Sequence, residues 1–208
     1  MHSSLSRLRE RAGVRVQAQR HDPPAEVPCR LESLADIESA VWRELGLAVR
    51  DPGHDWRVAV LATVDGDDAD ARCVVLRDFD PSDRTLLVYT DSRSPKAGQV
   101  AANERGVLVL WSEKLGWQLR LKVVLSLETT GLRASSRWTQ LKLTPAAHDY
   151  LSPLPPGTPI NTPPPSRESR EHFAVLAAQI LSADWLELHA DGHRRARFGA
   201  SDATWITP

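Results

Sequence analysis

The sequence predicts a mainly β protein, an antiparallel barrel or sandwich with a few flanking helices. Short runs rich in valine and leucine follow one another at close spacing, and turn residues bound each of them. These runs lie at 57–64, 72–79, 85–90, 106–111 and 117–128. A single short helical segment interrupts them, whereas a parallel sheet would need a crossover between each pair of strands.

The N-terminal segment 1–30 has weak periodicity and is predicted to be an arm that precedes one domain over 31–208. Five arginines lie in 1–20 against one acidic residue, Glu10. The basic composition leaves a targeting segment open as an alternative, but no apolar stretch follows that would indicate secretion. We therefore expect a solvated arm.

A first helix is expected at 33–49. Ser33 suits the N-cap, and Asp36 stands three residues later in a capping-box-like position. Leucine, isoleucine, valine and alanine recur on one face of this segment. Between the first two strands, Asp65-Gly66 predicts a hairpin, and a second turn is expected at 80–83.

The remaining elements alternate in type. Helices are predicted at 94–104, with Ser94 as cap and Pro95 in the first turn, and at 135–143. The stretch 153–165 holds seven prolines and is expected to be an extended connection. A helix is then predicted at 167–181, followed by strands at 185–189, 194–200 and 204–206.

Composition narrows the function classes. The formal net charge is −1, so no overall basic character indicates nucleic acid or an anionic membrane as a partner. No apolar run approaches the roughly 20 residues that a membrane span needs. Cys29 and Cys73 make neither a disulfide framework nor a cysteine metal site. We expect a cytoplasmic protein that binds no metal.

The segment from Tyr89 to Lys96 is the most informative for chemistry. A strand is expected to end at Tyr89-Thr90, and a helix to begin at Ser94. A helix N-terminus offers unpaired N–H groups and a partial positive charge, and Arg93 and Lys96 add full charges. The segment therefore predicts a phosphate site, with an ordinary capped helix as the alternative.

The strand 72–79 carries an arginine at each end of its apolar part, Arg72 and Arg77. Either one could reach a phosphate or the edge of a ring, and an ion pair at the rim of the barrel is the alternative. His189 and His193 flank a turn and do not form a convincing metal pair.

Several weak motifs occur here in a specific order, and together they carry a resemblance. They are Leu61-Ala62-Thr63-Val64, Arg72 with Arg77, Thr90-Asp91-Ser92-Arg93-Ser94-Pro95-Lys96, Trp111, Gln118-Leu119-Arg120, Trp138 with Leu141, Pro156-Gly157, Leu186 with Leu188, and His193 to Phe198. Over about 33–208 the sequence resembles the pyridoxamine 5'-phosphate oxidase-like, FMN-binding family. The resemblance implies a six-stranded antiparallel split β-barrel and a homodimer with FMN at its interface.

The resemblance also implies roles for individual residues. Arg72, Ser94 and Lys96 would contact the FMN phosphate, with Arg93 adding a charge that Pro95 does not supply. The backbone of Val74 and Val75 would lie along the isoalloxazine ring. The other implied cofactor contacts are Arg77 near the reactive face, Tyr89 and Thr90 at the strand end, and Gln118 and Arg197 from the partner subunit.

The sequence departs from the family on the substrate side. The oxidase's Arg-x-His pattern is present only as His193-Arg194-Arg195, so His193 and Arg195 are the candidate substrate residues. Tyr150 is the candidate for a missing tyrosine, with no arginine near it at Ala147 or His148. Val123 stands near where the family has a glycine.

These departures favour an FMN oxidoreductase acting on an unidentified small molecule. The alternatives are a non-catalytic module that binds flavin or haem, and a dimeric scaffold that has lost its cofactor.

Overall fold

The computed structural model describes residues 30–161 and 171–208, and Glu32–Pro208 forms one compact unit. The predicted arm over 1–29, the end of the proline-rich connection and the start of the helix predicted at 167–181 lie outside the described residues. The described part of that connection, 153–161, contains neither helix nor strand, as predicted.

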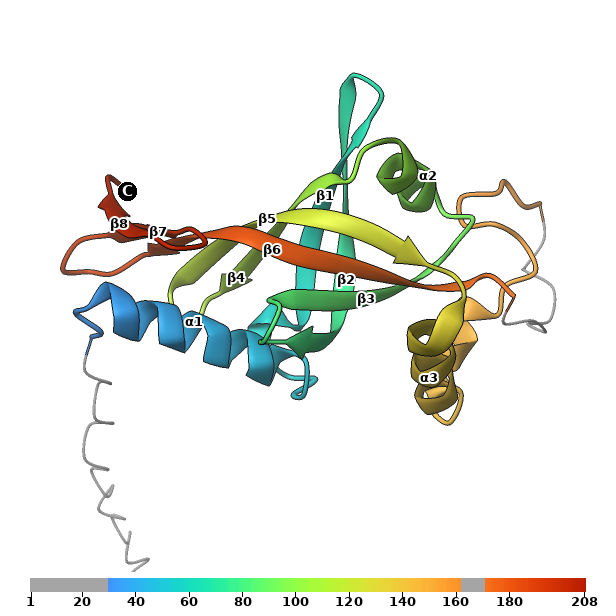
Figure 1. Ribbon diagram of the computed structural model, residues 1–208, viewed down its shortest axis with the longest axis horizontal. Coiled ribbons are helices and arrows are strands. Elements are labelled where there is room, and N and C mark those ends of the chain that lie inside the picture. Colours follow the sequence, from blue (N-terminus) through green and yellow to red (C-terminus); the bar gives the residue numbers. More distant parts are fainter. Residues whose placement is uncertain (1–29, 162–170) are drawn as a thin grey trace, which may run out of the picture. The chain divides into compact units, whose positions relative to one another are not determined.

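Eight antiparallel strands form one sheet in the described part of the chain. They are β1 (Val58–Asp65), β2 (Asp68–Asp80), β3 (Thr85–Asp91), β4 (Arg105–Ser112), β5 (Trp117–Glu128), β6 (Phe173–Glu187), β7 (Arg194–Phe198) and β8 (Ala203–Ile206). The strand order is β3-β2-β1-β4-β5-β6-β7-β8, and β3 also pairs with β6. That pairing closes six strands into a ring, while β7 and β8 extend from β6 (Figure 1). The predicted mainly β fold is thereby confirmed.

Within residues 30–161 and 171–208, three helices flank the sheet: α1 (Leu34–Ala48), α2 (Pro95–Ala102) and α3 (Gly131–Leu141). The same residues also form two 3-10 turns, at Asp55–Arg57 and Pro145–Tyr150. In Figure 1, α2 lies on the opposite side of the sheet from α1 and α3. The N-cap of α1 is as predicted, because Ser33 Oγ accepts a hydrogen bond from the backbone N–H of Asp36 at 3.1 Å. None of the helices in the described residues is long and apolar enough to span a membrane.

The predicted helix at 167–181 is wrong where the structure describes it, because Phe173 to Leu181 belong to the strand β6. This strand lies between β3 and β5, and its residues from Phe173 to Ala178 are buried on both faces. A strand buried on both faces loses the apolar–polar alternation that identifies strands in a sequence. Its apolar residues at Phe173, Leu176, Ala177 and Ile180 then reproduce the spacing of a helix face.

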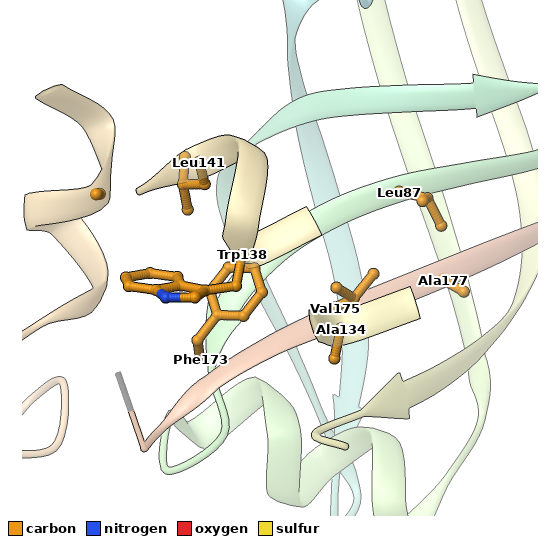
Figure 2. Packing of buried hydrophobic residues seen from close by; sticks show 8 residues of the cluster. Leu87, Ala134, Trp138, Leu141, Phe173, Val175 and Ala177 are labelled. Atoms are coloured by element: carbon orange, nitrogen blue, oxygen red, sulfur yellow. The ribbon is translucent and has the colours of Figure 1, made fainter. Parts of the chain in front are cut away.

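An apolar cluster joins α3 and the turn Pro145–Tyr150 to the sheet (Figure 2). Its members are Leu87, Ala134, Trp138, Leu141, Ala147, Phe173, Val175 and Ala177. Two of its rings, those of Trp138 and Phe173, lie with their centroids 5.2 Å apart. Tyr89 and Tyr150 pack against this cluster, so it holds two aromatic side chains beside the strand end where the sequence predicts a site.

Candidate functional site

The loop from β3 to α2 brings four of the predicted residues together. Ser94 holds the N-cap position of α2, yet its hydroxyl makes no bond to the helix N–H groups. Instead, Ser94 Oγ lies 3.3 Å from Thr90 Oγ1, and both residues are buried. Pro95 follows in the first turn of the helix, as predicted. The Ser94 hydroxyl therefore lies beside the end of β3 and does not cap the N–H groups of the first turn of α2.

Lys96 makes fewer hydrogen bonds than Arg93, the other cation of this loop. Its Nζ donates to Thr90 Oγ1 at 3.0 Å, which is its one hydrogen bond to the described residues. Burial lowers the pKa of Lys96, and the nearby charge of Arg72 lowers it further, against weaker opposing effects of Asp91 and Asp70. An ammonium group with donors to spare beside a guanidinium group suits an anionic ligand.

Arg72 is held by a polar network that the sequence reasoning missed. Its guanidinium donates to Thr63 Oγ1 at 2.5 Å, to Gln99 Oε1 at 2.8 Å and to Asp70 Oδ2 at 2.5 Å. Gln99, buried in α2, also donates to Asp70 at 2.9 Å. The ion pair with Asp70 agrees with the alternative expectation for Arg72, an ion pair at the rim of the barrel. The same network fixes the guanidinium next to Lys96, so the two expectations are compatible.

The strand β2 offers backbone groups beside this cluster. Its pairing with β3 covers only Leu76 to Asp80, so Val74 and Val75 have no β3 partner within the described sheet. Both residues pair with β1 on the other edge, opposite Ala59 and Val58. The β3-facing backbone edge at Val74 and Val75 can therefore accept a ligand, as the resemblance implies for the flavin ring.

Arg77 lies at an irregularity in the same ladder. The register shifts between Leu76 and Asp78, so Arg77 is the extra residue of a β-bulge. Its guanidinium lies 5.8 Å from the centre of the Tyr89 ring and donates to the Tyr150 hydroxyl at 3.4 Å. Arg77 Nε is buried without a hydrogen-bond partner among the described residues.

Tyr89 and Tyr150 form an aromatic wall next to Arg77. Their ring centroids lie 6.3 Å apart in an edge-to-face arrangement, and each also contacts Phe173 edge to face. Burial is the main cause of a raised pKa at Tyr89. Tyr150, which the sequence offered only as a substrate candidate, is thus brought to Arg77 by the fold.

Arg93 has a different environment from Lys96. Its guanidinium pairs with the carboxylate of Asp91 and also donates to three backbone carbonyls, those of Ser152, Pro153 and Leu154. The predicted phosphate contact of Arg93 stays a prediction, and the contacts in the structure favour another role.

The remaining predicted residues lie on the outer side of β5 to β7. Arg195 makes a bidentate contact with Asp184, at 2.9 Å to each carboxylate oxygen, and Arg120 donates to the same group at 2.6 Å. Arg197 and Asp184 line a cavity of about 380 Å³. Gln118 lies on β5 opposite Trp111, and the ring nitrogen Nδ1 of His193 accepts from the backbone of His189 in the turn before β7. Among the described residues, no hydrogen bond or ion pair joins these residues to Arg72, Ser94 or Lys96.

An apolar surface continues from this group over β1 and β4. Val58 is 49% exposed, Val60 39%, Val64 37% and Trp111 45%. Val60 lies between Cys73 on β2 and Val109 on β4, so the exposed valines belong to one continuous face of the sheet. Exposed apolar patches of this kind mark interaction surfaces.

Comparison with known proteins agrees with this geometry. Residues 39–127 match the sequence model of the pyridoxamine 5'-phosphate oxidase FMN-binding domain. A pyridoxine/pyridoxamine 5'-phosphate oxidase from Trichormus variabilis is 31% identical over 99 residues. That match covers 44% of this chain and 45% of the relative, so the chain aligns with somewhat less than half of the oxidase.

Solved structures extend the likeness over most of the chain. A pyridoxamine 5'-phosphate oxidase-related, FMN-binding protein from Nostoc punctiforme has a TM-score of 0.68 at 25% identity. The alignment covers 85% of this chain and 99% of that one. PhzG from Burkholderia lata, solved with tetrahydrophenazine-1-carboxylic acid, has a TM-score of 0.69 at 15% identity over 88% and 100% of the two chains, and shows the shared fold. Over residues 39–127 the chain is thus similar to the FMN-binding domain of the pyridoxamine 5'-phosphate oxidase family, and over most of its length it shares the fold of the Nostoc punctiforme protein.

Proposed function

We propose that this protein binds FMN and acts as an FMN-dependent oxidoreductase on a small molecule. The observation that carries the proposal is the position of Lys96 beside Arg72 at the start of α2, with a lowered pKa and donors to spare. Hydroxyl groups of Thr90 and Ser94 lie at the same place. A phosphate monoester fits this donor set, because it accepts several charge-assisted hydrogen bonds at once.

The rest of the cofactor would lie along β2. The unpaired backbone edge at Val74 and Val75 offers N–H and C=O groups to the polar side of a flavin ring. Arg77 and Tyr89 would lie toward its reactive face. Bound FMN supplies the redox chemistry, and these residues position it and keep water out. Because the redox chemistry would come from FMN, the proposed reaction requires no nucleophile or acid–base pair from the protein.

A homodimer is part of the proposal. The exposed valines of β1 and Trp111 of β4 form an apolar face, which a second copy of the chain would cover. Gln118 lies on β5, which pairs with β4, and Arg197 lies on β7, two strands further along the sheet. In the proposed dimer each would reach the cofactor of the partner. The cavity at Arg197 would then become part of a shared site.

The substrate is expected to differ from pyridoxamine 5'-phosphate. Arg195 was a candidate substrate residue, but its guanidinium is committed to Asp184. His193 lies in an exposed turn. Tyr150 and Arg77 remain next to the expected flavin face, and they offer a hydroxyl and a positive charge to a substrate.

The test is a flavin titration of the purified protein. FMN should bind far more tightly than riboflavin, which lacks the phosphate, and the protein should sediment as a dimer. Reduction of the bound flavin by a screened substrate and its reoxidation would establish an enzyme. Stable flavin binding without turnover would favour a storage or sensing module, and preferential haem binding would refute the FMN site.

A further inference from the structure

Arg93 bridges two segments that are far apart in the sequence. From the loop after β3 its guanidinium reaches the carbonyl oxygens of Ser152, Pro153 and Leu154 at 2.8, 3.0 and 3.3 Å. The same group holds Asp91, with Nε 3.0 Å from one carboxylate oxygen and Nη2 2.7 Å from the other. One side chain therefore ties the β3–α2 loop to the chain that follows the turn Pro145–Tyr150.

The carboxylate of Asp91 fixes the orientation of the Arg93 guanidinium. It is buried, and it also accepts from the backbone N–H of Arg93 at 2.8 Å. Burial acts to raise the pKa of Asp91, but the hydrogen bonds and charge of Arg93 outweigh it, so the net pKa is lowered. The hydrogen bond to Asp91 raises the pKa of Arg93 in turn. The pair is thus ionised at neutral pH and oriented toward the carbonyls.

The tied segment carries Tyr150 directly before it. Tyr150 contacts Tyr89 and Phe173, and its hydroxyl accepts from Arg77. No other hydrogen bond among the described residues joins 152–154 to the β3–α2 loop. Release of these carbonyls would therefore free the residues that follow Tyr150 and loosen the aromatic wall.

The geometry points to Arg93 as a positioning residue that holds Tyr150 against Arg77 by binding the carbonyls of 152–154, and not as a ligand of the FMN phosphate. The Arg93 contacts carry this inference, and its link to catalysis rests on the proposed function. A lysine at position 93 keeps the positive charge but cannot bridge Asp91 and three carbonyls at once. Arg93→Ala and Arg93→Lys should consequently behave alike.

Two measurements separate the roles. Chymotrypsin cleaves after Tyr150, and the initial rate of this cleavage, followed by mass spectrometry, reports release of the segment. The ratio of the riboflavin to the FMN dissociation constant reports phosphate contacts alone. Lys96→Met is the control for a lost phosphate contact, and Arg133→Ala is the control for a lost ion pair, since Arg133 pairs with Glu128 at 3.0 Å.

Both Arg93 variants should raise the cleavage rate at least about 10-fold, the effect of losing charged hydrogen bonds that close a local opening. Their riboflavin-to-FMN ratio should stay within about 2-fold of wild type, whereas Lys96→Met lowers it at least about 10-fold. An unchanged cleavage rate, a rise equal to that of Arg133→Ala, or a fall in the ratio like that of Lys96→Met would overturn the inference. If wild type binds no flavin, the proposed function fails, and the cleavage rates alone decide the role of Arg93.

Discussion

Replacement of Lys96 by methionine tests the phosphate site most directly. Methionine keeps an unbranched side chain of similar length and removes the charge. One charge-assisted hydrogen bond to phosphate contributes about 1.5–3 kcal/mol, so FMN should bind about 10- to 150-fold more weakly. Riboflavin has no phosphate, and its affinity should change by less than about 2-fold, since the flavin ring contacts are retained.

The same change should not damage the apo fold. Burial and the Arg72 charge lower the pKa of Lys96, so the folded protein holds this ammonium group at a cost. The unfolded chain binds more protons between the folded and unfolded pKa values, and wild-type apo stability therefore rises with pH across that window. The methionine variant lacks this rise. At neutral pH two effects oppose each other in the apo variant. Removal of the desolvated ammonium group raises the free energy of unfolding, and loss of the hydrogen bond to Thr90 lowers it by about 0.5–1.5 kcal/mol, so the apo stability should stay close to that of wild type.

The assay is a set of thermal melts with and without saturating flavin, together with calorimetric titration. The FMN-dependent gain in unfolding free energy should shrink by about 1.5–3 kcal/mol in the variant, because that gain depends on the dissociation constant. Equal losses of FMN and riboflavin affinity would show that Lys96 contacts the ring or supports the fold. An undiminished FMN effect would place the phosphate elsewhere.

Further changes test the neighbouring features. Arg72→Ala should weaken FMN binding to a similar degree but also lower the apo melting temperature, because Asp70 loses its guanidinium partner; denaturant melts of the apo protein check this. Val60→Lys should convert the dimer to a monomer in sedimentation and abolish tight FMN binding, whereas Leu132→Lys, at a 91% exposed position on α3, should leave the dimer intact. Asp184 is half-buried, and although desolvation acts to raise its pKa, its bonds to Arg195 and Arg120 lower the pKa overall, so it contributes stability that is lost as pH falls toward its folded pKa. The Asp184→Asn variant should therefore lose less stability than wild type between neutral and acidic pH, measured by urea unfolding.

The local elements were predictable because their signals are local. The cap at Ser33, the hairpin at Asp65-Gly66 and the helix begun by Pro95 depend on residues within a few positions of one another. The candidate site was approachable for the same reason, since Thr90, Ser94 and Lys96 fall in one strand–loop–helix segment. Arg72 was found through a motif on a second strand.

Tertiary structure decided what depends on distant residues. Strand β6 has the sequence pattern of a helix, and its state is set by pairing with β3 and β5 on both sides. Gln99 reaches Arg72 across 27 positions and Tyr150 reaches Arg77 across 73, and no sequence period reports such contacts. The charge of Arg93 was visible in the sequence, but its partners 152–154 are backbone carbonyls. Every residue carries a carbonyl, so only the folded chain determines which of them a side chain meets.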